Sequence, residues 1–393
     1  MQVSIIIVSY NVRHYLRQCL QSVWQSAQSA GLEVEVFVVD NHSTDDSIAH
    51  LRQHFGAYEQ GRMPKARLHL IANKVNVGFG RANNQALKRC TGKYVLFLNP
   101  DTIVTERTLA DCWAEAERHE RLGAMGVTML HTNGRFAHES RRGLPTPWTA
   151  FCKMSGLARL FPRSKTFGHY YMRYLDENEA HSIEIVSGAF MWCSHQALKE
   201  CGGFDEQFFM YGEDIDLSYR FLLAGYDNRY LPTPILHYKG ESTQKNTYKY
   251  VHVFYEAMLI FFKKHFPTSS AFLSLPVTAA IYVQAFATLL RQNFLALGRY
   301  LWPNRYRMPT TMLYIGPQHT FAALREKSET WGITPTCVEQ MPTSLKAAVV
   351  AFSAEHHSYE SILQQLQQSD HSAHLGIYYP STECLVMGSN ILT

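Results

Sequence analysis

The sequence has little net charge, no closely paired cysteines, no internal repeat and no low-complexity tract. Its 37 lysines and arginines exceed its 33 aspartates and glutamates by only four, which is too small a surplus for a nucleic-acid-binding protein. Its eight cysteines include no C-x-x-C pair, so we expect reduced core residues of a cytosolic protein rather than a disulfide or zinc framework. The N-terminus has neither a basic n-region nor a cleavage site, so no signal peptide is expected.

The chain instead shows alternating strand and helix patterns over its first 115 residues. Apolar runs predict buried strands at 3–9 and 35–40 and further strands at 68–72 and 93–98, with helices at about 12–29 and 79–90. Ser43 followed by Asp46 predicts a capped start for one more helix. This βαβα order predicts an α/β fold whose mainly parallel sheet has helices on both faces.

The pattern changes along the rest of the chain. Residues 116–250 are rich in loops, short strands and aromatics, with helices near 196–200 and 214–224, as expected of an acceptor-side half next to a nucleotide-binding half at 1–115. Residues 251–308 have a helical, aromatic-rich pattern. Strand and helix patterns resume at 309–393, which predicts a small α/β unit of unknown role.

Polar clusters follow the predicted strands, where ligands bind in open α/β sheets. They are Ser9-Tyr10-Asn11, Asp40-Asn41, the segment 76–80 and Asn99-Pro100-Asp101. Asp40 could accept hydrogen bonds from a base or ribose, or cap the next helix. Gly78 could let the backbone approach a ligand, or simply form a turn. The shared position of these clusters indicates a ligand site more strongly than any one of them.

Asp101 is the strongest single signal among these residues. It follows the apolar run 94–98 and should lie at the ligand edge of the sheet. A carboxylate there suits Mg²⁺ or Mn²⁺, which bind oxygen and bridge phosphates. The alternative is an acid in the turn after Pro100.

Three acids, Glu213, Asp214 and Asp216, open a helix after Gly212. Acids are favoured at a helix N-terminus, so a capping cluster is one explanation. A carboxylate at a loop junction can also act as general base for a hydroxyl nucleophile. We predict Asp214 as the base, with Glu213 as its neighbour or orienting group.

His237 follows another apolar strand pattern. Its imidazole could complete a metal shell opposite Asp101, or it could be an ordinary core or loop histidine. Arg81 and Lys239 are candidate phosphate contacts.

Together these segments resemble the family 2 inverting glycosyltransferases, especially the rhamnosyltransferase-like branch that builds cell-wall and O-antigen glycans. The matching stretches are VSIIIVSYN at 3–11, VVDNHSTD at 38–45, NVGFG at 76–80, FLNPD at 97–101, VSGAFM at 186–191, GFDE at 203–206 and YGEDID at 211–216. They occur in the family's order over about residues 1–265. The resemblance implies a GT-A (Rossmann-like) fold and a nucleotide-sugar donor, dTDP- or UDP-linked, with rhamnose favoured only at family level.

The resemblance also implies roles for single residues. Tyr10, Asn11 and Asp40 would hold the nucleoside. The other residues predicted to bind the donor are Ser9, Asn76, Gly78, Arg81, Asn99 and Asp101. Asp101 and His237 would bind Mg²⁺ or Mn²⁺, Gly188 and Ala189 would line the acceptor side, and Asp214 would be the base. Asn99 stands where many relatives carry a first aspartate, so metal affinity would be modest. The nucleotidyltransferase cousins carry a glycine-rich N-terminal loop that Ser9-Tyr10-Asn11 replaces, which disfavours their chemistry.

The implied reaction is a single displacement onto a hydroxyl of a glycan or polyprenyl-linked glycan acceptor, with inversion. A catalytically silent scaffold that binds sugar nucleotides or partner enzymes is the alternative. Residues 271–290 carry no charge over twenty positions, which is long enough for a spanning helix. Basic and aromatic flanks favour docking on the inner face of the cytoplasmic membrane instead. Buried or homodimer-forming helices are the further alternative.

Overall fold

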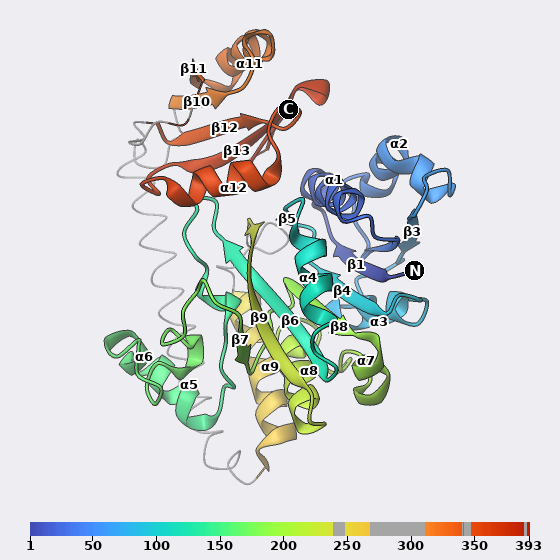
Figure 1. Ribbon diagram of the computed structural model, residues 1–393, viewed down its shortest axis with the longest axis vertical. Helices are drawn as coiled ribbons and strands as arrows, with labels where there is room; N and C mark the ends of the chain where they lie inside the picture. The colour runs from blue at the N-terminus through green and yellow to red at the C-terminus, as the bar shows by residue number, and fades with distance from the viewer. Residues whose placement is uncertain (239–247, 268–310, 340, 342–346, 389–390) are drawn as a thin grey trace.

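The computed structural model describes residues 1–238, 248–267, 311–339, 341, 347–388 and 391–393. Within these residues it contains two β-sheets, a larger one formed by the first part of the chain and a smaller one formed by the last part (Figure 1). The α/β fold class predicted from the sequence is confirmed.

The larger sheet has nine strands in the order β3-β2-β1-β4-β8-β6-β9-β5, with β7 paired to β9. Its strands are β1 Val3–Ser9, β2 Val34–Asp40, β3 Ala66–Ala72, β4 Tyr94–Leu98, β5 Thr102–Val104, β6 Leu122–Leu130, β7 His181–Ile183, β8 Phe190–Ser194 and β9 Asp227–His237. The longest pairings, β1 with β2, β2 with β3 and β6 with β9, are parallel. The sheet is therefore mainly parallel, as predicted.

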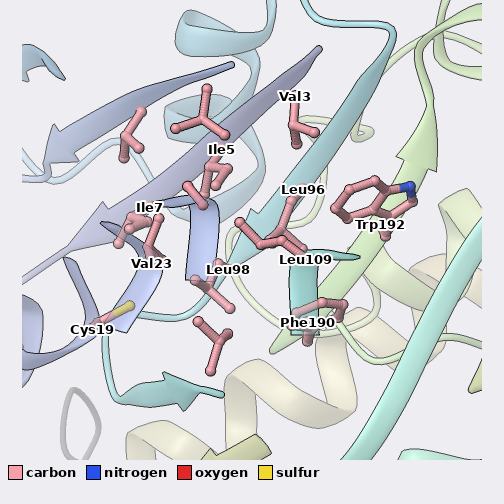
Figure 2. Close-up of a cluster of buried hydrophobic side chains, with 14 of the residues drawn as sticks. Val3, Ile5, Ile7, Cys19, Val23, Leu96, Leu98, Leu109, Phe190 and Trp192 are labelled. Carbon is pink, nitrogen blue, oxygen red and sulfur yellow. The ribbon is translucent and has the colours of Figure 1, made fainter. Parts of the chain in front are cut away.

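Helices cover both faces of this sheet. The helices of this part of the chain are α1 Arg13–Ala30, α2 Ser47–Glu59, α3 Phe79–Leu87, α4 Thr108–Ala116, α5 Pro147–Met154, α6 Leu157–Leu160, α7 His195–Cys201, α8 Glu213–Leu223 and α9 Tyr248–His265, with 3₁₀ turns at His138–Ser140 and His169–Tyr171. Of these, α5 and α6 lie at the margin of the molecule (Figure 1). Alternate residues of each strand enter different cores, because side chains in a strand point to opposite faces. Figure 2 shows one core, where Ile5 and Leu96 of the sheet pack against Val23 of α1 and Leu109 of α4. Ile6 belongs to the other core, with residues of α3, α7 and α8.

The predicted helix start at Ser43 is wrong, because α2 begins at Ser47. The polar side chains just before α2 instead accept hydrogen bonds from the loop that follows β1 and from the start of α1. Ser43 Oγ accepts a hydrogen bond from the backbone N–H of Asn11, and the Asp45 carboxylate accepts one from Arg13 N. Asp46 has a positive φ of 57°. These residues therefore anchor the start of α1 instead of forming a helical turn.

The smaller sheet has the order β11-β10-β12-β13-β14-β15. Its elements are β10 Thr311–Ile315, α11 Gln318–Trp331, β11 Thr334–Val338, β12 Val349–Ser353, α12 Tyr359–Gln368, β13 His374–Tyr379, the 3₁₀ turn Pro380–Thr382, β14 Cys384–Met387 and β15 Ile391–Leu392. The first four strands pair in parallel and the last two pair antiparallel. The expected α/β pattern of this segment is therefore present.

The two sheets share an apolar core, although the smaller sheet also has a core of its own. Tyr15 of α1 packs in the shared core and its hydroxyl donates to the carbonyl oxygen of Met387 at 2.9 Å. The carboxylate of Glu106 accepts hydrogen bonds from the backbone N–H groups of Tyr359 and Glu360, each at 2.9 Å. Glu106 thus caps α12 from outside the smaller sheet, which ties the two parts together.

The prediction for residues 251–308 can be followed only at its start. Helix α9 covers the beginning of that stretch, whereas the uncharged segment 271–290 lies outside the described residues. Among the helices that the structure does describe, none has the length and apolarity needed to cross a membrane. All eight cysteines are free thiols, as expected.

Candidate active site

The carboxyl ends of β1 and β2 bring the first two predicted polar clusters together. Ser9 and Asp40 are direct partners in the parallel register, and both side chains are buried. Ser9 Oγ and Asp40 Oδ1 have no hydrogen-bond partner among the described residues. Because buried polar atoms are nearly always satisfied, these two atoms are suited to contact a polar ligand.

Asn11 organises the loop after β1. It has a positive φ of 54°, a conformation that asparagine tolerates better than most residues. Its side-chain oxygen accepts a hydrogen bond from Thr44 N at 2.7 Å. Tyr10 beside it remains 39% exposed, so its ring is open to a planar partner such as a base.

Asn41 holds the loop that contains Asn76 and Gly78. Its amide nitrogen donates to Asn76 Oδ1 at 2.9 Å, and its amide oxygen accepts from Val77 N at 3.0 Å. The sequence placed Asn41 in a strand-end cluster but predicted no role for it. An asparagine directly after a buried strand was the available signal, and the structure shows it as a bridge between two loops.

Gly78 is needed for a close approach of the chain to itself. Its φ is 87°, and a Cβ atom added there would lie 2.7 Å from the carbonyl oxygen of Phe209. The same oxygen accepts a hydrogen bond from Phe79 N at 2.8 Å. The donor-side loop is thereby joined to the loop that leads into α8.

The structure brings Asp101 and His237 together just after the end of β4. Strand β5 pairs antiparallel with β9, with Thr102 opposite His237, and this pairing brings Asp101 Oδ1 to 3.4 Å from His237 Nε2. Both side chains are buried, and His237 Nδ1 has no hydrogen-bond partner in the described part of the chain.

The donor atoms of this pair fit a hard or borderline divalent cation. A carboxylate oxygen and an imidazole nitrogen are adjacent, and Mg²⁺ commonly takes only one or two protein ligands when phosphates supply others. Within the residues that the structure describes, no group of three or more histidine, cysteine, aspartate or glutamate side chains is gathered for a metal. The pair would therefore act together with ligand oxygens.

Asp214 lies at the start of α8 and is held by three hydrogen bonds. Arg142 Nη2 and Gly188 N donate to its Oδ2 atom at 2.5 and 3.0 Å, and Ile215 N donates to Oδ1 at 2.8 Å. Arg142 and Asp214 side chains are only 13% and 14% exposed. These contacts stabilise the carboxylate anion and fix its orientation, as a general base requires.

Arg142 is the residue that the sequence interpretation missed. It also donates to the carbonyl oxygen of Val186 at 3.0 Å. Burial is the largest single effect and would lower the pKa of Arg142, but the charge and hydrogen bond of Asp214, together with Tyr170 and Glu139, outweigh it and raise that pKa. No motif marked Arg142, because its position depends on the bridge between its segment and Ile185.

Glu213 has a different environment from its neighbour. It is 6% exposed, and its Oε2 atom has no hydrogen-bond partner among the residues described. Burial, followed by the charge of Asp214, raises the pKa of the Glu213 carboxyl above its ordinary value. Glu213 thus lacks the hydrogen bonds that hold Asp214, which is consistent with Glu213 as a neighbour rather than as the base.

The third acid of the cluster joins α8 to α9. Asp216 is fully buried and forms ion pairs with Arg220, Lys264 and His265. Burial alone would raise the pKa of Asp216, but the hydrogen bond from Lys264 and the charge of Arg220, with His265, outweigh it and lower that pKa. Its contacts are with the protein's own cations.

The residues predicted for the donor side and for the acceptor side meet where β4 pairs with β8. Leu98 lies opposite Phe190 in that antiparallel pair, and Asn99 N donates to the carbonyl oxygen of Ala189 at 2.9 Å. The next residue along is Gly188, whose N–H donates to Asp214. The predicted acceptor residues Gly188 and Ala189 therefore connect the 99–101 turn with the predicted base.

Arg81 lies on the exposed surface of α3. Its Nε atom donates to Glu206 Oε2 at 2.9 Å, and its side chain is 56% exposed. A phosphate contact from Arg81 would compete with this ion pair and stays a prediction. Lys239, the other candidate, lies outside the described residues.

Comparison with known proteins gives the family. The model described as "Glycosyl transferase family 2" matches residues 4–202. The chain is 26% identical over 269 residues to an N-acetylglucosaminyl-diphospho-decaprenol L-rhamnosyltransferase of Mycobacterium tuberculosis, covering 65% of this chain and 82% of that protein. It is 25% identical over 245 residues to rhamnosyltransferase WbbL of Escherichia coli K12, covering 58% and 80%.

Solved structures with similar folds were also found. One is the mannosyltransferase PcManGT from Pyrobaculum calidifontis in complex with GDP-Man and Mn²⁺, with 17% identity and a TM-score of 0.47, covering 77% of this chain and 82% of that one. The assignment itself rests on the family match, which spans half of the sequence and includes the ends of β1, β2 and β4. The chain belongs to glycosyl transferase family 2 and is a glycosyltransferase.

Proposed function

We propose that this enzyme moves a sugar from a dTDP- or UDP-linked donor to a hydroxyl group of a glycan or lipid-linked glycan, with inversion. Rhamnose is the favoured sugar, because two relatives are named as rhamnosyltransferases and the chain aligns with most of the length of each. The observation that carries the proposal is the link from Asn99 through Ala189 and Gly188 to Asp214. That link joins the Asp101–His237 pair to a buried, oriented carboxylate.

The donor would occupy the edge formed by β1, β2 and β4. Tyr10 and Asn11, with the buried Ser9 and Asp40, would hold the nucleoside. The remaining predicted donor contacts are Asn76, Gly78, Arg81 and Asn99. Asp101 and His237 would hold Mg²⁺ or Mn²⁺, which when bound neutralises charge on the departing diphosphate.

Asp214 would accept the proton of the acceptor hydroxyl while that oxygen bonds to the anomeric carbon. The bond from this carbon to the nucleoside diphosphate breaks in the same step, so the configuration inverts. Arg142 and Gly188 keep the Asp214 carboxylate in place through their hydrogen bonds. Burial of this group excludes water from competing for it.

We further propose a polyprenyl-linked acceptor and a cytoplasmic location at the inner face of the cytoplasmic membrane. The support is a relative whose name describes transfer to a decaprenol-linked sugar. A role in cell-surface polysaccharide synthesis follows from the same relatives.

The test is a panel of UDP-, dTDP- and GDP-sugars offered to the purified protein with Mn²⁺, Mg²⁺ or a chelator. Release of the nucleoside diphosphate in the presence of a metal and acceptor would identify the donor. Binding of a sugar nucleotide without release, under all of these conditions, would favour the silent scaffold. If no sugar nucleotide binds, the proposed function is refuted.

A further inference from the structure

We propose that α5, α6 and the loop that follows them form a docking surface for an anionic lipid bilayer. This α5–α6 surface comprises residues 147–167. Four of its large apolar side chains are exposed, namely Trp148 by 49%, Phe151 by 53%, Leu160 by 71% and Phe161 by 51%. Soluble proteins seldom leave so many large apolar groups together in water, and such patches usually mark an interaction site.

The aromatic side chains of this surface form one continuous group. The ring centroids of Trp148 and Phe151 are 5.7 Å apart, those of Trp148 and Phe167 are 6.1 Å apart, and those of Phe161 and Phe167 are 5.5 Å apart. In Figure 1, α5 and α6 lie at the margin of the molecule, to one side of the large sheet. The group therefore presents a connected apolar ridge rather than scattered single residues.

The charged residues along this stretch of the sequence are all basic. The stretch from residue 141 to residue 175 contains no aspartate or glutamate. Arg159, Arg163, Lys165 and Arg173 are exposed along it. None of the ion pairs found among the described residues includes any of these four. Basic residues around exposed aromatic side chains match the headgroup region of an anionic membrane.

The same charges disfavour a second copy of the chain as the occupant. In a two-fold dimer this surface would face itself, because such an interface uses the same patch on both subunits. The exposed arginines and lysine would then meet like charges. An anionic lipid surface supplies the complementary charge and also covers the aromatic ridge.

The surface lies close to the predicted base. Lys153 of α5 lies 3.5 Å from the centre of the Tyr170 ring, and the Tyr170 carbonyl oxygen accepts a hydrogen bond from Gly143 N at 3.1 Å. Gly143 directly follows Arg142, the partner of Asp214. A bilayer bound at α5–α6 would thus approach the acceptor side. That last step rests on the proposed function, whereas docking on lipid does not.

The test uses the full chain and vesicles of phosphatidylcholine with or without phosphatidylglycerol. We expect cosedimentation with the anionic vesicles to exceed that with neutral vesicles at least ~10-fold and to fall as salt is added. Arg159→Gln/Arg163→Gln is expected to weaken binding roughly 25-fold, at about fivefold for each charge. Trp148→Ser/Phe161→Ser is expected to weaken it at least ~10-fold.

Matched control variants change the same residue types elsewhere on the surface. Arg62→Gln/Lys65→Gln removes the same charge, and Met63→Ser/Leu223→Ser removes two other exposed apolar side chains. Both controls should bind vesicles as the wild type does. Release of nucleoside diphosphate with a soluble acceptor should be unchanged in all four variants, which separates failure of docking from failure of the proposed function.

Three results would overturn the proposal. The first is wild-type protein that ignores anionic vesicles or binds neutral ones equally well. The second is vesicle binding that survives in both α5–α6 variants, since another segment would then be responsible. The third is a wild-type dimer that becomes a monomer in Trp148→Ser/Phe161→Ser, because the occupant would then be a second copy.

Discussion

Asp214→Asn is expected to lower sugar transfer and to destabilise the fold at the same time. Loss of a general base typically costs about 10²- to 10⁴-fold in rate. The change also leaves the buried guanidinium of Arg142 without its counter-ion. Breaking a buried ion pair in this way costs ~3–5 kcal/mol. The side chains of Arg142 and Asp214 remain 13% and 14% exposed. We therefore expect a loss of stability at the low end of this range, about 3 kcal/mol.

The double variant Asp214→Asn/Arg142→Met separates chemistry from stability. This variant also removes the buried guanidinium of Arg142 that Asp214→Asn leaves without a counter-ion. Most of the lost free energy of unfolding should therefore be recovered. Transfer should remain as low as in Asp214→Asn, because the base is still absent. Urea denaturation would measure the stability, and release of nucleoside diphosphate would measure the rate. Affinity for the sugar nucleotide should stay close to that of the wild type in both variants.

The control is Glu59→Gln, which breaks an exposed ion pair with Arg52 and should change stability by less than about 1 kcal/mol. A double variant that recovers transfer to near the wild-type rate would refute Asp214 as the base. An Asp214→Asn variant as stable as the wild type would refute the reasoning about the buried pair. The two parts of the argument can therefore fail independently.

Four other changes test the remaining parts of the structure. His237→Ala removes one side chain of the proposed metal-binding pair and should raise the Mn²⁺ or Mg²⁺ concentration for half-maximal transfer at least ~10-fold, measured by metal titration; an unchanged titration would contradict the assignment. Gly78→Ala places a Cβ atom 2.7 Å from Phe209 O at a positive φ, so we expect a loss of ~1–3 kcal/mol in urea denaturation and weaker donor binding by calorimetry. Glu106→Ala removes the acceptor for two backbone N–H groups of α12 and should cost about 1 kcal/mol; no change in the urea midpoint would argue against a cap between the two sheets. Since the folded protein lowers the pKa of Asp216, that carboxylate stabilises the fold above its unfolded pKa of about 3.9. The stability gap between wild type and Asp216→Asn should thus be full at neutral pH and shrink as pH falls below about 4, and a gap that persists in acid would contradict this.

Strands β1, β2 and β4 could be predicted because they are buried on both faces. Such strands appear in sequence as unbroken apolar runs, and β1 begins and ends at the predicted residues. The start of α2 could not be predicted from local pattern alone. Ser43 has a side chain suited to a helix cap. However, its hydroxyl oxygen accepts a hydrogen bond from the backbone N–H of Asn11 in the neighbouring loop. Local preference was overridden by a contact with a distant segment.

The candidate site could likewise be predicted only in part from the sequence. The polar residues at the strand ends could be predicted, because every parallel strand ends at the same edge of the sheet. The closeness of Asp101 to His237 depends on the antiparallel pairing of β5 with β9. The position of each residue after an apolar strand pattern suggested this pair, and so did the resemblance to a family, but their spacing along the chain did not. Their roles in metal binding and donor binding stay predictions.

The sequence by itself determined the fold class, the family and the residue types at the ligand edge, because apolar periodicity and strand-end motifs are local properties. Tertiary structure decided which charges are partners. No sequence motif around Arg142 indicates a role for it. Only the folded chain places its guanidinium against the carboxylate of Asp214. The exposed ridge on α5 and α6 is likewise defined by what the rest of the molecule leaves uncovered. Pairing and exposure depend on distances between remote segments, which no local pattern contains.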